Sequence, residues 1–295
     1  MQVHLIDGTF ELFRAYFAVP QSQNAAGVEI GAARGLLRSF GALLASGGVT
    51  HVGCAFDHVI ESFRNELFEG YKTGEGIDPS LYSQFGLAER VTRALGMVTW
   101  PMIEFEADDA IATAALRFAE HADVTRVVIA SPDKDLTQCL VRDNVVCWDR
   151  IRNSYLDASG VVSKFGVAPT SIPDYLALVG DSADGIPGVP RWGAKSASSV
   201  LAEYEHLEHI PSNPKEWRVK VRGADALSAS LESLRDAALL YRRLATLRFD
   251  VPLPETLDDM RWRGAPDGEL AALCDELGDT TVLERLRSSG QTRSA

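Results

Sequence analysis

The sequence lacks the features that mark secreted and membrane-spanning proteins. Its 295 residues include four cysteines, and none of them stands in a Cys-x-x-Cys spacing. A disulfide framework and a cysteine-based zinc site are therefore not expected. The sequence also has no signal-peptide pattern and no apolar run of about 20 residues, the length that crosses a bilayer. We expect free buried thiols and a cytoplasmic location.

Positive charge is scarce as well. The chain has 29 Lys and Arg residues against 41 Asp and Glu residues, which gives a net charge of −12. Affinity for a nucleic-acid backbone normally comes from cations that displace counterions. A nucleic-acid-binding function would therefore have to depend on local basic patches and on metal ions bound by the acidic residues. We expect weak, salt-sensitive binding without divalent ions.

The acidic residues that are present fall in a regular pattern. Three short apolar runs, at residues 3–6, 52–56 and 127–130, read as buried strands, and each is followed by an aspartate: Asp7, Asp57 and Asp133. Helical patterns lie between these runs, as in a parallel sheet covered on both faces. Ligand sites in such sheets form at the carboxyl ends of the strands. The three aspartates are therefore expected to converge.

Further acids follow the same logic. Asp108 begins a helical stretch in which Ile111, Ala115 and Phe118 recur at intervals of three to four residues, so its side chain should point toward the sheet. The complete set of acids in the five clusters is Asp7; Asp57; Glu106, Asp108 and Asp109; Asp133 and Asp135; Asp181 and Asp184.

Such a set of carboxylates needs cations. Crowded carboxylates repel one another, which raises their pKa values and destabilises the fold unless positive charge offsets the repulsion. Hard oxygen ligands in this number suit Mg²⁺ or Mn²⁺. Each cluster taken alone has an ordinary explanation as a helix cap, a first-turn acid or a turn. The acids at strand ends, however, are not needed as caps.

These residues stand in motifs that resemble the 5′-nuclease superfamily, which includes the 5′ to 3′ exonuclease domain of bacterial DNA polymerase I, bacteriophage 5′ nucleases and flap endonucleases. The resemblance runs from about Val3 to the Thr246 region. The segments that carry it are Leu5-Ile6-Asp7-Gly8, Phe56-Asp57, Ser62-Phe63-Arg64, Tyr71-Lys72, Glu106-Ala107-Asp108-Asp109, Asp133-Lys134-Asp135-Leu136 and Gly180-Asp181-Ser182-Ala183-Asp184-Gly185-Ile186-Pro187-Gly188.

The resemblance implies a fold. Residues 1–165 would form a PIN-like (Rossmann-like) α/β domain with a mostly parallel sheet and flanking helices, carrying an arch or gateway at about residues 61–90. Residues 166–295 would form a helical region with a helix-three-turn-helix element at about residues 180–205 and C-terminal helices. The stripe of Leu231, Leu234, Ala238 and Tyr241 predicts one helix over residues 229–247.

It also implies an activity. The chain would be a stand-alone, metal-dependent 5′-3′ exonuclease or 5′-flap endonuclease of DNA replication or repair. It would act as a monomer on DNA with 5′ ends, flaps or nicks, alongside a separate DNA polymerase. Two Mg²⁺ or Mn²⁺ ions would take part, and the products would carry 5′-phosphates. The residues assigned to one ion are Asp7, Asp57, Glu106 and Asp108; those assigned to the other are Asp135, Asp181 and Asp184; Asp109 and Asp133 would bridge or support them.

Basic residues are expected to contact substrate phosphates. Arg64 and Lys72 match the family's phosphate-contacting positions in the arch, and a basic residue also occurs in relatives at the position of Arg14. Solvated cations and a surface salt bridge are the ordinary alternatives. The arch departs from the family pattern, because residues 61–90 hold six acidic residues against three basic ones and Glu75 stands where relatives carry a cation. Threading of a long single strand is therefore in question.

The resemblance implies that the last motif binds duplex DNA. A Gly/Pro-rich turn leads into a helix and exposes backbone N–H groups that can bind a phosphate. Relatives commonly carry Gly-Ile-Gly where this chain has Arg191-Trp192-Gly193, so a cation replaces a flexible glycine. The resemblance also suggests a K⁺ ion here, unless Arg191 reshapes the turn. The residues expected to bind DNA are Gly188, Arg191, Gly193, Lys195 and Ser196.

Two other functions fit parts of the pattern. A PIN-type ribonuclease would share the acids at the strand ends but would lack the duplex-binding turn. A flap- or junction-binding protein with weak catalysis would follow if the acidic arch and the altered turn impaired turnover. A run of four cations, Lys215, Arg218, Lys220 and Arg222, could extend a duplex-binding track or could be a solvated loop.

Overall fold

A computed structural model describes residues 1–294, and its chain divides into two compact units. The first unit contains residues 1–60, 74–131 and 249–295, and the second contains residues 61–73 and 132–248. Each unit is thus assembled from separate stretches of sequence. The predicted arch at residues 61–90 is divided between them, and the predicted domain boundary at residue 165 stays a prediction.

A parallel sheet forms the centre of the first unit. Strand β1 pairs with β2 and β4, and β2 pairs with β3, all in the parallel sense. Parallel strands covered on both faces read as continuous apolar runs, and Val3, Leu5 and Ile6 of β1 are fully buried. The strands are β1 (Gln2–Asp7), β2 (His51–Asp57), β3 (Val98–Met102) and β4 (Arg126–Ala130).

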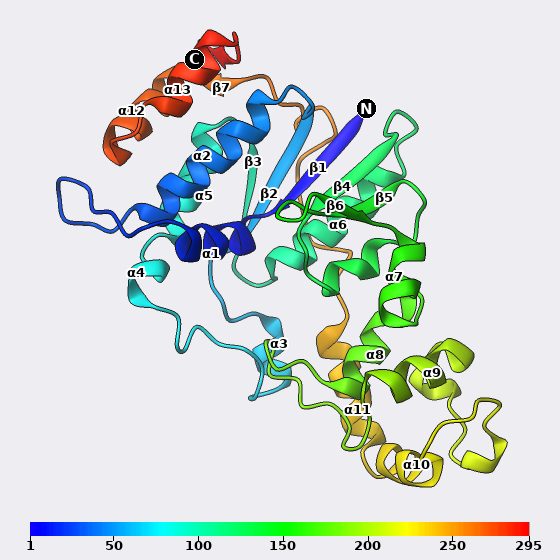
Figure 1. Ribbon diagram of the computed structural model, residues 1–295. Helices are drawn as coiled ribbons and strands as arrows, with labels where there is room; N and C mark the ends of the chain where they lie inside the picture. The colour runs from blue at the N-terminus through cyan, green and yellow to red at the C-terminus, as the bar shows by residue number, and fades with distance from the viewer. Residues whose placement is uncertain (295) are drawn as a thin grey trace. The chain divides into compact units, whose positions relative to one another are not determined.

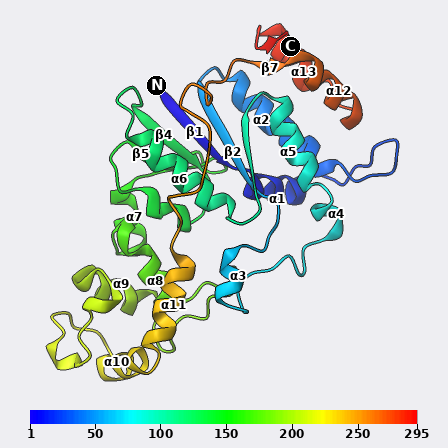
Figure 2. The same cartoon turned by 180° about the vertical axis from the view of Figure 1, so that it is seen from behind.

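Helices cover both faces of this sheet. Helix α6 packs against all four strands on one face, while α1 and α5 pack on the other and α2 packs against both of them (Figures 1 and 2). The helices of this unit are α1 (Gly8–Ala18), α2 (Gly31–Ala45), α4 (Pro79–Tyr82), α5 (Phe85–Ala94), α6 (Ala107–Ala119), α12 (Asp267–Leu277) and α13 (Thr281–Ser288). This arrangement is the predicted α/β class, and that prediction is confirmed.

The C-terminal stretch belongs to the first unit. Arg117 donates hydrogen bonds to the carbonyl oxygens of Leu253 and Glu255, both at 2.7 Å. Helices α12 and α13 then pack on α5 and α2, where Val282 fills the space left by Gly41. The short strands β7 (Ala265–Pro266) and β8 (Thr292–Arg293) pair in parallel.

The second unit is mainly helical. Its core is the pair α8 and α11, against which α9 also packs through α8, and its one hairpin joins β5 and β6 in the antiparallel sense. The helix predicted over residues 229–247 is wrong, because Leu234 leaves helical geometry at φ −126° and ψ 20° and splits it into α10 and α11. The elements are α3 (Phe63–Leu67), η1 (Asp135–Cys139), β5 (Val145–Asp149), β6 (Ser154–Leu156), α7 (Ala158–Phe165), η2 (Pro169–Ser171), α8 (Ile172–Val179), α9 (Ala194–Tyr204), η3 (Leu207–His209), η4 (Pro214–Glu216), α10 (Ala224–Ser233) and α11 (Arg235–Ala245).

Within residues 1–294, no helix combines the length and the apolar character needed to span a bilayer.

Candidate metal centre and nucleic-acid interface

Two acids stand at the carboxyl end of the parallel sheet in the first unit. Asp7 ends β1 and is 6% exposed; its Oδ1 accepts from the backbone N–H of Phe10 at 2.8 Å, and its Oδ2 accepts from Ser131 Oγ at 2.9 Å. Asp57 ends β2, and its backbone N–H donates to Thr9 Oγ1 at 2.8 Å. The strand ends thus hold both carboxylates at the edge predicted from the sequence.

The start of α6 brings more acids to Asp57. The Asp57 carboxylate accepts a 2.8 Å hydrogen bond from the backbone N–H of Ala107, the first residue of α6. Glu106 and Asp109 form a capping box around the same helix end, in which Asp109 Oδ2 accepts from the Glu106 N–H at 3.1 Å. Asp109 is completely buried, whereas Asp108 is only partly buried. This geometry gives Asp109 a capping role, and metal binding by Asp109 stays a prediction.

Three further acids meet in the second unit. Asp135, Asp181 and Asp184 each offer a carboxylate oxygen, and these atoms lie within 4.8 Å of one another. Asp135 and Asp181 are 8% and 7% exposed, and Asp135 Oδ1 is buried without a hydrogen-bond partner among the described residues. Asp133 supports the group, because its Oδ1 accepts from the Asp135 N–H at 2.8 Å. Three hard oxygen donors with one unsatisfied oxygen suit a divalent cation.

The charges in this cluster are strongly coupled. Burial, and then the neighbouring carboxylates of Asp133, Asp184 and Asp181, raise the pKa of Asp135 well above its usual value. The ammonium of Lys134 lies 2.6 Å from Asp181 Oδ2 and 3.8 Å from Asp135 Oδ1. Although burial opposes its charge, these carboxylates raise the pKa of Lys134. The ammonium of Lys134 therefore offsets part of the negative charge of this cluster.

Lys72 is tied to the same cluster. Its ammonium lies 3.2 Å from Asp184 Oδ1, and its backbone N–H donates to the Asp184 carbonyl oxygen at 3.0 Å. The side chain keeps 27% of its surface exposed. Lys72 is thus held beside the predicted ligands, where a cation could also meet a substrate phosphate. That contact stays a prediction.

Arg64 has a different environment from the one that the motif suggested. The residue is 1% exposed, and its guanidinium donates to the carbonyl oxygens of Leu244 at 2.8 Å and Thr246 at 3.0 Å. These carbonyls lie at the end of α11, where helix carbonyls lack intrahelical partners. The geometry gives Arg64 a positioning role, and its direct contact with a phosphate stays a prediction.

Arg14 in α1 forms the salt bridge that was the ordinary alternative. Its guanidinium pairs with the buried Glu11 and donates to Ser39 Oγ at 2.9 Å. The side chain remains 27% exposed. A phosphate contact by Arg14 would therefore have to use the part of the guanidinium that faces solvent.

The predicted duplex-binding turn has the tight backbone that its glycines allow. Gly188 has φ +75°, and a Cβ atom there would lie 2.5 Å from the backbone nitrogen of Gly180. Arg191 has φ +74°, a left-handed conformation that glycine adopts at little cost and other residues adopt rarely. Arg191 thus adopts a backbone conformation that glycine would adopt without strain.

Helix α9 begins directly after this turn. Its N-cap is Gly193, which offers no side chain, and Ser196 Oγ accepts from the Gly193 N–H at 3.0 Å. Lys195 is exposed in the first turn, and Arg191 is exposed just before it. Two cations thus flank a helix N-terminus, an arrangement that favours anions.

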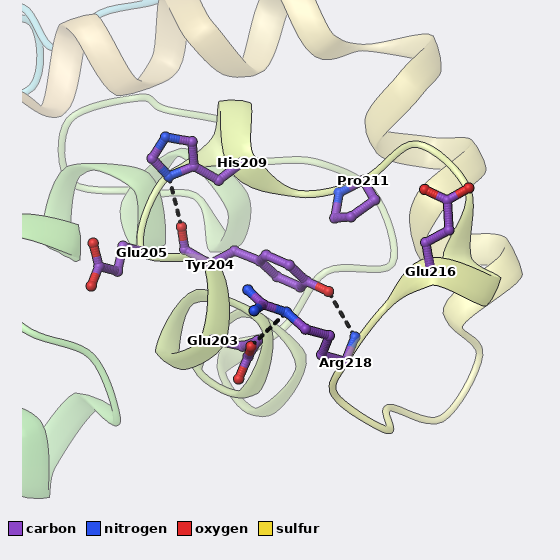
Figure 3. A pocket seen from close by; sticks show the side chains of 7 residues that line it. All are labelled: Glu203, Tyr204, Glu205, His209, Pro211, Glu216 and Arg218. Atoms are coloured by element: carbon purple, nitrogen blue, oxygen red, sulfur yellow. Dashed lines mark hydrogen bonds and ion pairs between the residues drawn. The ribbon is translucent and has the colours of Figure 1, made fainter.

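The cations of residues 215–222 do not form one free row. Arg218 pairs with Glu203 at 2.8 Å, lies over the ring of Tyr204 and donates its backbone N–H to the Tyr204 hydroxyl at 2.7 Å (Figure 3). These residues line a pocket of about 470 Å³ with two more glutamates, Glu205 and Glu216. Arg218 is therefore partly neutralised, which favours the solvated-loop interpretation of this run.

Two protein-family models match most of this chain. Residues 2–166 match the 5′-3′ exonuclease N-terminal resolvase-like domain, and residues 167–267 match the 5′-3′ exonuclease C-terminal SAM fold. The first match alone covers more than half of the chain. The chain belongs to the 5′-3′ exonuclease family.

Curated relatives of this exonuclease-family chain are DNA polymerases. It is 34% identical over 290 residues to DNA polymerase I of Bacillus caldotenax, a match that covers 96% of this chain and 32% of the polymerase. It is 37% identical over 292 residues to DNA polymerase I of Pseudomonas aeruginosa, covering 96% and 31%. The chain spans about a third of the length of these relatives.

Solved structures share the exonuclease fold. T5 5′-exonuclease with bound zinc matches with a TM-score of 0.66 at 16% identity and covers 98% of both chains. The catalytic core of Rad2 in complex with DNA substrate matches with a TM-score of 0.61 at 15% identity, covering 98% of this chain and 92% of that one. Their agreement with the exonuclease-family chain supports the predicted resemblance and fold.

Three residues of this candidate site were missed by reasoning from the sequence. Thr9 and Ser131 hold the strand-end aspartates Asp57 and Asp7, and Lys134 pairs with the acids of the second unit. The motifs do not identify the Thr9 and Ser131 hydroxyls as hydrogen-bond partners of these aspartates, because each hydroxyl is distant in sequence from the aspartate that it contacts. Lys134 carried a signal, since it stands between two predicted ligands.

Proposed function

We propose that this chain is a metal-dependent nuclease that hydrolyses DNA phosphodiester bonds as a 5′-3′ exonuclease and a 5′-flap endonuclease, in DNA replication or repair. The observation that carries the proposal is the meeting of Asp135, Asp181 and Asp184 within 4.8 Å, with one buried oxygen left unsatisfied. Membership of the 5′-3′ exonuclease family supports it.

The acidic residues would hold two divalent ions, Mg²⁺ or Mn²⁺. Asp7, Asp57, Glu106 and Asp108 of the first unit would bind one ion, and Asp135, Asp181 and Asp184 of the second unit would bind the other. Such ions lower the pKa of water and stabilise the charge of a leaving oxygen, so hydrolysis would leave 5′-phosphates. Asp133 would support the second set, since it already holds the Asp135 backbone.

The remaining polar residues would position these ligands and the DNA. Lys72 holds Asp184 through both its ammonium and its backbone N–H, which would fix the carboxylate and leave a cation near the scissile phosphate. Arg64 would act by fixing the end of α11, and Arg14 by its exposed guanidinium edge. Hydrogen bonds from cationic side chains such as Lys72 and Arg14 to a phosphate would stabilise the charge that develops during its transfer.

Duplex DNA would bind at the turn before α9. Arg191 and Lys195 would contact phosphates, Gly188 and Gly193 would let the backbone approach them, and Ser196 would fix the helix N-terminus through Gly193. A K⁺ ion at this turn stays a prediction. DNA affinity that is equal in KCl and in tetramethylammonium chloride would argue against it.

The remaining parts of the proposal concern partners and setting. The chain would work as a monomer in the cytoplasm, and a DNA polymerase would act on the same DNA, since the relatives that it matches are DNA polymerases. Sedimentation of the chain alone tests the monomer.

A 5′-labelled flapped duplex incubated with Mg²⁺ tests the activity. We expect short labelled products with Mg²⁺ and none in EDTA, and we expect Asp135→Asn to reduce cleavage strongly. Asp225→Asn, which changes an exposed acid at the start of α10, is the matched control. Preferred cleavage of RNA would indicate a ribonuclease, and tight binding without products would indicate a junction-binding protein.

A further inference from the structure

A second candidate site lies in the first unit, at the amino ends of the parallel strands, whereas Asp7 and Asp57 lie at their carboxyl ends. A pocket of about 790 Å³ is lined by the amino ends of β1 and β2, the turn after α6, and residues 257–262. Strand β1 has six residues, so its amino end lies about 17 Å from Asp7 at the usual rise per residue. The volume lies within the range of pockets that bind small organic ligands, about 300–1,000 Å³.

His51 gives this pocket a hydrogen-bond acceptor. The Thr50 hydroxyl donates its one proton to the Gln2 carbonyl oxygen at 3.2 Å, so its oxygen must accept from His51 Nδ1 at 3.0 Å. The other ring nitrogen, Nε2, then carries a lone pair, and it makes no hydrogen bond within residues 1–294. Burial, followed by the nearby charges of Arg261 and the chain's amino terminus, lowers the pKa of His51 and keeps the ring neutral. His51 is 7% exposed and lines the pocket, which makes this nitrogen the candidate acceptor for a ligand there.

Arg261 gives the same pocket a cation. Its backbone pairs with that of His51 in an isolated antiparallel bridge, which places the two residues side by side. Its side chain is exposed and makes no ion pair in the described part of the chain. The nearby Asp258 carboxylate is paired with Arg263 at 2.7 Å instead. The guanidinium of Arg261 is therefore available to an anionic group.

An apolar wall completes the pocket. Trp262 is fixed by a 2.8 Å hydrogen bond from its indole N–H to the Leu95 carbonyl oxygen, and Val49 and Leu257 line the pocket with it. An aromatic ring with its N–H already satisfied offers a surface for stacking. The pocket thus offers an acceptor, the guanidinium of Arg261 and an aromatic wall. Asp123, Asp258 and Met1 also line it, and the Met1 ammonium donates to the Asp123 carbonyl oxygen at 2.7 Å.

We propose that this pocket binds a nucleoside monophosphate. An N–H group of the base would donate to His51 Nε2, the base would lie against the wall formed by Trp262, and the phosphate would pair with the guanidinium of Arg261. An inorganic anion would use only the cation, and an uncharged nucleoside would use only the acceptor and the wall. The ligand that uses all three is a planar heteroaromatic base joined to a phosphate. This site requires no metal and does not depend on the proposed nuclease activity.

Calorimetric titration of the intact chain with adenosine 5′-monophosphate in EDTA tests the proposal. We expect saturable binding at one site, with weaker binding of adenosine, ribose 5-phosphate and inorganic phosphate. Arg261→Ala should weaken the binding about tenfold or more, since it removes a charged hydrogen bond. Arg285→Ala, which removes an exposed arginine of α13 outside the pocket, should leave it unchanged.

Three results would overturn it. Absence of saturable binding in EDTA would remove the site, and phosphate binding as tightly as the nucleotide would remove the base-binding part. Loss of binding in Asp135→Asn, with binding kept in Arg261→Ala, would move the ligand to the acidic cluster. Because nuclease activity is measured separately with Mg²⁺, failure of this site and failure of the proposed function are distinguishable.

Discussion

Replacement of Arg191 by glycine should stabilise the fold while weakening DNA binding. Arg191 holds φ +74°, and a left-handed conformation costs a residue other than glycine roughly 1–2 kcal/mol. Glycine removes this cost but adds about 0.5–1 kcal/mol of conformational entropy to the unfolded chain. The net expectation for Arg191→Gly is therefore a gain of about 0.5–1 kcal/mol in the free energy of unfolding.

Two variants separate the backbone from the charge. Arg191→Ala removes the cation but keeps the strained backbone, so its free energy of unfolding should stay within about 0.5 kcal/mol of the parent. Both variants should lose DNA affinity to the same extent if the guanidinium contacts a phosphate, and the salt dependence of binding should fall by about one phosphate contact. Urea unfolding and fluorescence anisotropy with a duplex measure the two effects. A glycine variant no more stable than the alanine variant would refute the strain argument.

The acidic cluster, the tight turn and a buried histidine yield further expectations. Asp135→Asn should raise the melting temperature in EDTA, because it removes a buried carboxylate from a group of carboxylates. It should also reduce the increase in melting temperature that Mg²⁺ causes. The control Asp225→Asn, at an exposed position, should change neither quantity. Gly188→Ala should cost at least about 2 kcal/mol in chemical unfolding, because its Cβ would strike a backbone nitrogen, whereas Gly193→Ala, with open space around it, should be nearly neutral. Burial lowers the pKa of His4 to about 4, below its unfolded value of 6.5. The free energy of unfolding should therefore be highest above pH 6.5 and about 2 kcal/mol lower at pH 5, where only the unfolded state binds the proton. Urea unfolding of His4→Leu above pH 6.5 and at pH 5 should show a smaller difference between the two conditions.

The sequence was sufficient to predict the parallel sheet and the acids at its carboxyl edge. The apolar runs before Asp7 and Asp57 are signals within a few residues, and parallel strands bring their ends to one edge. The surroundings of Arg64 could not be predicted in the same way. Its partners are the carbonyls of Leu244 and Thr246, about 180 residues further along the chain, and a motif does not record such long-range contacts.

The apolar periodicity of the sequence also could not predict a local break in a helix. Leu234 fits the apolar stripe of a single helix, yet its backbone ends α10 and starts α11. No glycine or proline marks this position, so the helical period continues through it. At Arg191 the opposite holds, because the unusual residue was visible in the sequence, whereas its left-handed backbone conformation required the structure.

Cleavage of a 5′-labelled flapped duplex by the native chain and by the double variant Asp108→Asn plus Asp135→Asn tests the central proposal most directly. One substitution lies in each acidic set, so two-ion hydrolysis should be lost in the variant while its fold, checked by circular dichroism, is kept. We expect Mg²⁺-dependent short products from the native chain and no detectable products from the variant. Equal cleavage by the two proteins would contradict the assignment of these carboxylates to the metal centre.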